Sequence, residues 1–207
     1  LPCWMVSHAA VPIAEHLIDD VFRVYFSVRD KRNRSITTSL VVDINRPHEL
    51  LSLGTAPVLS PGDLGGFDDS GAMATWLTNA NDRKLLYFIG WNLGVTVPFR
   101  NAVGVAGEVS SGVYERLFRG PILDRTPSEP HFCASCCVVR DKGFYRIWYL
   151  ACSGWRIIDG QPQHRYHIRY AESKDGIEWQ RDGRIAIDFA DEAEYAISRP
   201  SVLRDSN

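Results

Sequence analysis

The feature of this sequence that most limits its fold is an internal repeat with a spacing of about 61 to 65 residues. Three aromatic, strand-like segments mark the repeat: Arg23–Ser27, Leu85–Ile89 and Arg146–Leu150. Each follows another apolar run and a turn, such as Asp141–Gly143, whose glycine can take the positive φ of a hairpin. A long repeat without an amphipathic helix indicates repeated units of β-structure.

Two further strands are expected in each unit. The third strands are predicted at Ser35–Ile44, Asn101–Val109 and Tyr166–Glu172, and the fourth at Ala56–Leu59, Gly120–Leu123 and Arg184–Ile187. Four-stranded units that repeat radially are typical of β-propeller blades. A β-sandwich is the alternative, but it offers no reason for so long a period. We therefore predict an all-β fold of the β-propeller class.

The repeat also predicts how the chain is divided. We expect one propeller domain over residues 1–207, with blades at about 5–60, 61–124 and 125–190 and the start of a fourth at 191–207. Arg199–Asp205 is expected to be the first strand of that fourth blade. Because an open stack of three blades leaves sheet edges exposed, we expect the domain to be incomplete at this length.

Composition excludes several classes of partner. The net charge of −2 leaves no excess of lysine and arginine for a nucleic acid or an anionic membrane. No apolar run reaches the roughly 20 residues that cross a bilayer.

Cysteine usage bears on metals and on location. The five cysteines are odd in number and clustered, which argues against a disulfide framework and predicts buried, reduced thiols in a cytoplasmic protein. Cys133 and Cys136 are three apart on a strand and are expected on opposite faces, so we predict no metal site there. No cofactor is predicted; a Ca²⁺ ion in a central channel is compatible with such a fold, but no ligand set demands one.

Candidate catalytic residues lie where the innermost strand of each blade begins, because these points converge on the propeller axis. Asp68 and Asp69 precede the second inner strand and Glu129 precedes the third. One ionised carboxylate beside one protonated acid is the equipment for glycosidic cleavage, with Asp68 or Asp69 as the former and Glu129 as the latter. The alternative is that the aspartates cap a turn before Gly71 and that Glu129 belongs to a loop before a proline.

Other side chains could bind a substrate at the same face. His8 and His131 occupy near-equivalent places in the first and third blades and could donate to hydroxyl groups or act as acid–base groups. Arg199 could bind an anion in bidentate fashion, and Trp91 or Trp155 could lie on the rim against a sugar ring.

Several of these segments resemble one family. Ser173–Trp179 reads Ser-Lys-Asp-Gly-Ile-Glu-Trp, residues 146–149 read Arg-Ile-Trp-Tyr, and residues 65–71 read Gly-Gly-Phe-Asp-Asp-Ser-Gly. Together they resemble the five-bladed propeller glycosidases, which include arabinanases, β-xylosidases, invertase-like enzymes and β-mannoside phosphorylases. Residues 90–92, 97–99 and 120–123 resemble glycosidase-like proteins encoded with polysaccharide biosynthesis genes.

The resemblance implies five blades, a carbohydrate substrate and three acidic residues, one from each of the first three blades. Asp68 or Asp69 matches the second by position and Glu129 matches the third. The first has no counterpart, because Ser7–Pro12 carries no aspartate. Three functions therefore remain open: metal-independent cleavage or transfer of a glycosidic bond, sugar binding without catalysis, and a scaffold for protein partners. Ser173–Trp179 is expected to form a structural turn, with Trp179 packed between blades.

Overall fold

The computed structural model describes residues 1–80 and 83–204, and these residues form three successive groups of four antiparallel strands. The first group is β1 (Ser7–Ile18), β2 (Val21–Arg29), β3 (Ser35–Asp43) and β4 (Leu50–Leu53). The second is β5 (Gly71–Ala80), β6 (Arg83–Leu93), β7 (Phe99–Ser110) and β8 (Val113–Arg116). The third is β9 (Cys133–Asp141), β10 (Phe144–Ile158), β11 (Gln161–Ser173) and β12 (Ile185–Ile187).

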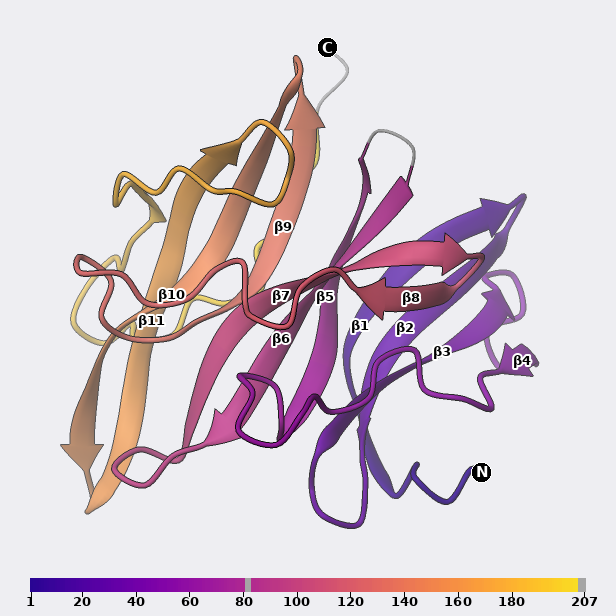
Figure 1. The fold of residues 1–207 in the computed structure, drawn as a ribbon, viewed down its shortest axis with the longest axis horizontal. Helices are drawn as coiled ribbons and strands as arrows, with labels where there is room; N and C mark the ends of the chain where they lie inside the picture. The colour runs from indigo at the N-terminus through magenta and orange to yellow at the C-terminus, as the bar shows by residue number, and fades with distance from the viewer. Residues whose placement is uncertain (81–82, 205–207) are drawn as a thin grey trace.

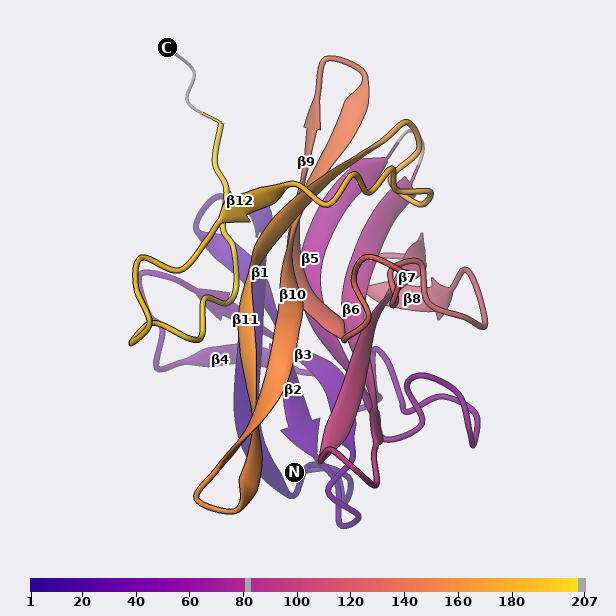
Figure 2. The same ribbon diagram turned by 90° about the vertical axis from the view of Figure 1, so that its left-hand side faces the viewer.

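The three groups lie side by side as a fan. Figure 1 shows the first group in indigo on the right, the second in magenta at the centre and the third in orange on the left. Viewed from its left-hand side in Figure 2, the third group stands in front of the other two. The first two groups join through one parallel pairing, Ser35 with Gly71, and the third forms a separate sheet. The architecture is that of part of a β-propeller.

The outer strands differ from the sequence prediction. The segments 56–59 and 120–123 were predicted as fourth strands, but β4 and β8 form earlier in the chain. After them the chain continues along the same edge of the third strand, where Leu59 pairs with Thr37 and Leu123 with Val103 as isolated bridges. Both leucines are buried, so their apolar side chains are fixed by core packing. Only the third group's expected strand at 184–187 coincides with its outer strand, β12.

A β-bulge interrupts the pairing of every inner strand. The ladder shifts between Ala10 and Ile13 in β1, between Ala74 and Trp76 in β5, and across the β9 residues that face Tyr149 and Ala151 of β10. A bulge reverses the face on which the following side chains lie. The repeat seen in the sequence therefore extends to a repeated irregularity of the backbone.

The bulge in β9 corrects the expectation for its cysteines. Cys133 and Cys136 were predicted to point to opposite faces, but both lie in one buried cluster between the second and third groups. The extra residue between them restores them to the same side of the strand. Both thiols are free, and burial raises the pKa of Cys133 to about 12. They are packing residues at neutral pH.

The turn at Ser173–Trp179 has the structural role predicted for it. Asp175 Oδ1 accepts hydrogen bonds from the Ile177 and Glu178 amides at 2.8 and 2.9 Å. Tyr87 of the second group donates to the Gly176 carbonyl at 2.8 Å. The Trp179 ring packs against the core between the second and third groups. The turn thus fastens neighbouring groups to each other.

The inner strands converge on one cavity of about 310 Å³. Its walls come from β1, β5, β9 and the segment 199–201, which are spaced at roughly the repeat length. Residues 199–204 run beside β9, where Val202 contacts Cys137 and Arg204 pairs with Asp141, but they form no regular strand. Asp205, the last residue of the strand predicted there, lies outside the described residues. No helix in the described part of the chain has the length and apolarity to span a membrane.

Candidate functional site

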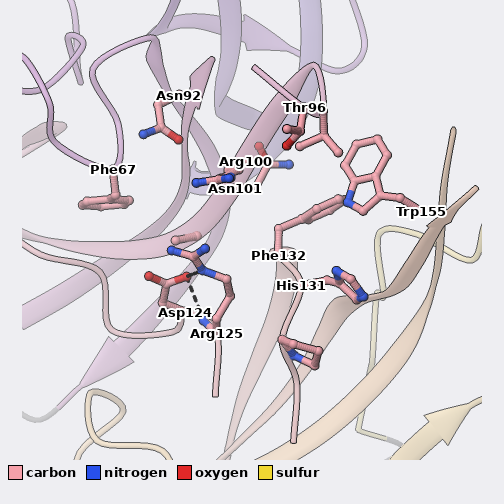
Figure 3. Close-up of a pocket in the computed structure, with 13 residues that line it drawn as sticks. Phe67, Asn92, Thr96, Arg100, Asn101, Asp124, Arg125, His131, Phe132 and Trp155 are labelled. Atoms are coloured by element: carbon pink, nitrogen blue, oxygen red, sulfur yellow. Dashed lines mark hydrogen bonds and ion pairs between the residues drawn. The ribbon is translucent and has the colours of Figure 1, made fainter. Parts of the chain in front are cut away.

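A second cavity, of about 320 Å³, lies between the second and third groups near the starts of their inner strands. Figure 3 shows Phe67 and Asn92 on one side and Trp155 and His131 on the other, with Arg125 below. The lining residues are Phe67, Asn92, Thr96, Val97, Arg100, Asn101, Ala102, Asp124, Arg125, Pro130, His131, Phe132 and Trp155. Aromatic rings, amides and two guanidinium groups thus border one space, a composition common in small-molecule sites.

Trp155 reaches this cavity because of a bulge in β10. The pairing with β11 shifts between Cys152 and Gly154, so Ser153 is an extra residue. Without it, Trp155 would lie on the opposite face of the strand from Cys152. With it, the indole joins Cys152 and Phe132 in the same apolar cluster. The bulge therefore places an aromatic face in the wall of the cavity.

A cluster of rings holds the indole in place. Trp155 packs against Phe99, Phe132 and His164 with ring centroids 5.7, 5.7 and 5.1 Å away. His164 also stacks on Tyr166 at 5.0 Å. Edge and offset contacts of this kind fix the orientation of each ring. The aromatic wall is pre-organised.

The polar part of the cavity comes from three segments. Asn92 lies at the end of β6, and Arg100 and Asn101 lie at the start of β7, where Asn92 pairs with Arg100 across the ladder. Asp124 and Arg125 come from the connection that leads to β9. The Asp124 carboxylate accepts from the Arg125 amide at 2.7 Å and lies 3.5 Å from the Arg125 guanidinium, as the dashed line in Figure 3 marks.

Asp68 and Glu129, two of the predicted catalytic carboxylates, are buried and paired with different arginines. Asp68 Oδ2 lies 2.7 Å from the Arg116 guanidinium, and Glu129 pairs with Arg181 and accepts from the Tyr149 hydroxyl at 3.1 Å. Both are only 3 to 5% exposed, and neither lines the cavity.

The two pairs are equivalent in the repeat. Arg116 also donates to the Ser60 carbonyl, and Arg181 donates to the Asp124 carbonyl. Each guanidinium lies over a ring of its own group, 5.3 Å from the Phe88 centroid and 5.4 Å from that of Tyr149. Each arginine therefore fastens the segment that leads into an inner strand, and we call these two arrangements the arginine clamps. A catalytic role for the two carboxylates stays a prediction.

Asp69 and His8 occupy less enclosed positions. Asp69 is half-buried and accepts from the Gly65 amide at 3.0 Å and the Ser70 hydroxyl at 2.9 Å, as a turn-capping aspartate does. It forms no ion pair with any described residue. His8 is exposed, and its ring contacts the Ser7 hydroxyl at 2.9 Å. Neither residue lines the cavity, and their catalytic roles stay predictions.

Trp91 and Arg199 lie away from the cavity as well. The Trp91 indole N–H donates to the Ser35 hydroxyl at 2.9 Å, and the Arg29 guanidinium covers its ring at 4.8 Å. Trp91 therefore joins the first and second groups with one ring face already covered. Arg199 borders the cavity between the inner strands and donates to the Pro12 carbonyl at 2.8 Å.

Of the eight site residues predicted from sequence, the structure brings His131 and Trp155 together at the cavity between the second and third groups. The carboxylates of Asp68 and Glu129 do not line this cavity, but the residues next to them in the sequence, Phe67 and Pro130, do. Sequence reasoning missed Arg100, Arg125 and the asparagines. The sequence does hold a signal for part of this set. Polar residues directly follow the aromatic residues Trp91 and Phe99, where two adjacent strands end and begin.

No group of three or more His, Cys, Asp or Glu side chains within residues 1–80 and 83–204 is arranged to hold a metal ion. That the protein needs no cofactor stays a prediction.

The aromatic wall predicts a pH effect on stability. Burial lowers the pKa of His164 from its ordinary value of 6.5, so the folded state binds a proton there less readily than the unfolded chain does. Because the unfolded chain then binds more protons, His164 lowers the free energy of unfolding as the pH falls below 6.5. We expect the free energy of unfolding of His164→Phe to fall less than that of the wild type between pH 8 and pH 5. Urea unfolding, repeated at intervals of about one pH unit, measures both. The exposed His48→Gln should follow the wild type, and parallel curves for His164→Phe would contradict the prediction.

Comparisons with known proteins place this geometry in context. Two proteins of Mycobacterium tuberculosis, "Uncharacterized protein MT1551" of strain CDC 1551 and "Uncharacterized protein Rv1502" of strain H37Rv, are each 39% identical to this chain over 203 residues. The match covers 98% of this chain and 67% of each relative. This protein is a member of their family. No family model matches the sequence.

Several solved structures similar to this protein are glycoside hydrolases or come from work on them. A glycosyl hydrolase from Bacteroides ovatus superposes with a TM-score of 0.61 at 16% identity, covering 88% of this chain and 52% of that one. A structure from work on the GH130 mannoside phosphorylase family gives 0.60 at 14% identity, covering 88% and 52%. A thermostable family-43 glycoside hydrolase gives 0.56 at 15% identity, covering 81% and 52%.

The family member therefore spans about half of the length of each of these solved proteins. At such low identity the likeness establishes the fold alone, which is that of a β-propeller. The fold prediction made from the repeat is confirmed, while the total number of blades stays a prediction.

Proposed function

We propose that this chain is part of a carbohydrate-active protein of the glycoside hydrolase type, which binds its glycan in the cavity between the second and third groups. The observation that carries the proposal is the composition of that cavity. Trp155 offers an apolar face for a sugar ring, and Asn92 and Asn101 offer amide groups for hydroxyls. Sugars need both, because their rings are apolar on one face and hydroxylated at the edge. The names of the solved structures agree with this class of ligand.

Within this proposal, cleavage or transfer of a glycosidic bond would depend on the predicted carboxylates. Asp69 is the strongest candidate of the three, because Asp68 and Glu129 are engaged in the arginine clamps and Asp69 is not. His131 would act at the cavity itself, on a hydroxyl group or a leaving group.

A second function, sugar binding without catalysis, is favoured by a specific observation. The two buried carboxylates are already neutralised by arginines, and the inner strand β1 presents the exposed His8 where the resemblance implies an acidic residue. Such a protein would keep the cavity and lack the acid–base pair.

The binding proposal is tested with Trp155→Ala. On an array of neutral and acidic oligosaccharides we expect the wild type to bind at least one glycan and the variant to bind it about tenfold more weakly, since an aromatic contact contributes about 1 kcal/mol or more. Phe144→Ala removes an exposed aromatic side chain at the far end of the same strand and should bind as the wild type does.

Asn92→Ala serves as a second variant, because the Asn92 side chain lines the cavity and makes no hydrogen bond to a described residue. It should weaken binding with an unchanged unfolding midpoint. Wild-type binding by both cavity variants would exclude the cavity as the glycan site. Each glycan that binds is also assayed for released reducing ends; product that disappears in Asp69→Asn supports catalysis, and binding without product supports the second function.

A further inference from the structure

The charges of this cavity favour one sign of ligand. Two arginines and one histidine line it, and Asp124 is the single acidic side chain among the lining residues. That carboxylate is already bonded to the backbone and side chain of Arg125. The cavity wall thus carries a net positive charge, although the whole chain carries a net charge of −2.

Of the cavity's two arginines, Arg100 is the one that forms no ion pair with a described residue. It is exposed at the start of β7, and no carboxylate within residues 1–80 and 83–204 lies within ion-pair distance of it. By contrast, Arg116 and Arg181 of the arginine clamps are bound to carboxylates and carbonyl groups. A guanidinium group without a protein partner can still meet a carboxylate in bidentate fashion.

We propose that the sugar bound in this cavity carries a carboxylate group, as a uronic acid residue does, and that Arg100, assisted by Arg125, receives it. This inference rests on the proposed function, because it names the class of sugar for the same cavity. The three features of the wall match the three features of such a sugar. Trp155 meets the ring face, Asn92 and Asn101 meet hydroxyl groups, and the guanidinium groups meet the anion.

The test compares sugars that differ only at C6. Binding of glucuronate, galacturonate and mannuronate to the purified protein is measured by saturation-transfer NMR against glucose, galactose and mannose. We expect at least one uronate to bind about tenfold more tightly than its neutral partner, which is the scale of a charge-assisted hydrogen bond. The advantage should shrink as salt is raised, because the cavity is open to solvent.

Arg100→Gln should remove most of the preference for the uronate and leave the affinity for the neutral sugar unchanged. Arg125→Gln should remove part of the same preference. Arg46→Gln, at an exposed turn far along the chain, is the matched control and should keep the full preference. Equal affinity for uronates and neutral sugars would overturn the inference, as would a preference that survives Arg100→Gln. Complete displacement of the uronate by equimolar inorganic phosphate would indicate a general oxyanion site and would also overturn it.

These outcomes separate the two proposals. Neutral and acidic sugars that bind equally well in the cavity leave the proposed function standing and refute the inference alone. Absence of any sugar bound at the cavity, in this assay and on the array, refutes the proposed function itself.

Discussion

Replacing Arg181 with methionine is expected to lower the free energy of unfolding by about 3 kcal/mol, the lower end of the usual cost of removing one partner of a buried ion pair, because Arg169 still lies 3.5 Å from the Glu129 carboxylate. The Arg181 side chain is 10% exposed, and the side chain of Glu129, whose carboxylate it binds, is 5% exposed. Arg181 also donates to the Tyr149 hydroxyl at 3.3 Å and to the Asp124 carbonyl. Methionine fills the volume of the stem but restores none of these bonds. Chemical denaturation in urea measures the loss.

The matched control for this change is Arg184→Met, three residues further along the chain. Arg184 pairs with Asp182 at 3.0 Å, but both side chains are about 60% exposed. Such surface pairs contribute about 0 to 1 kcal/mol. A second variant separates charge from packing: Arg181→Met with Glu129→Gln should recover part of the loss, because the buried carboxylate that lost its nearest cation is no longer charged. If the free energy of unfolding of Arg181→Met alone lies within about 1 kcal/mol of the wild-type value, the stabilising role of the arginine clamp is contradicted.

The clamp links stability to the proposed site. Arg181 binds both ends of the connection that carries Asp124, Arg125, Pro130 and His131 into the cavity wall. A weakened clamp should therefore loosen that wall before the whole fold is lost. This gives the buried carboxylate of Glu129 a positioning role that does not require it to touch a sugar.

Replacing Gly71 with alanine is expected to cost about 3 kcal/mol or to prevent folding. A Cβ atom there would lie 2.5 Å from the backbone nitrogen of Ser35 and 2.6 Å from the Trp91 indole nitrogen. The φ angle of +151° adds strain that only glycine avoids. Overpacking alone costs about 1 to 3 kcal/mol, and unfavourable backbone angles cost about as much again. Because Ser35 and Gly71 form the pairing between the first two groups, the backbone cannot move aside freely.

Gly120→Ala is the control for that prediction, since a Cβ atom at Gly120 would meet nothing within 4 Å. It should change the free energy of unfolding by less than about 1 kcal/mol. Urea unfolding of both variants decides the matter. A Gly71→Ala variant with the midpoint of the wild type would show that the junction between the two groups can relax.

The positions of the outer strands show where sequence reasoning stopped. Apolar segments such as 56–59 were assigned to the fourth strand because they are apolar and bounded by turn residues. In the structure Leu59 is buried against the third strand, while β4, which is at least as apolar, forms the outer edge with Leu50 and Leu51 exposed. Hydrophobicity therefore does not tell which of two neighbouring apolar segments forms the regular outer strand and which is buried in the core.

The repeat, the all-β class and the structural turn at Ser173–Trp179 could be predicted from the sequence alone, because these depend on local composition and on spacing along the chain. The sequence also pointed to His131 and Trp155. The position of Trp155 in the cavity wall could not be predicted in this way, since the bulge at Ser153 reverses the strand's alternation. Only the tertiary structure paired Asp68 and Glu129 with Arg116 and Arg181, which are far from them in the sequence. The partners of a charged side chain depend on which distant segments packing brings beside it, and no local pattern records that.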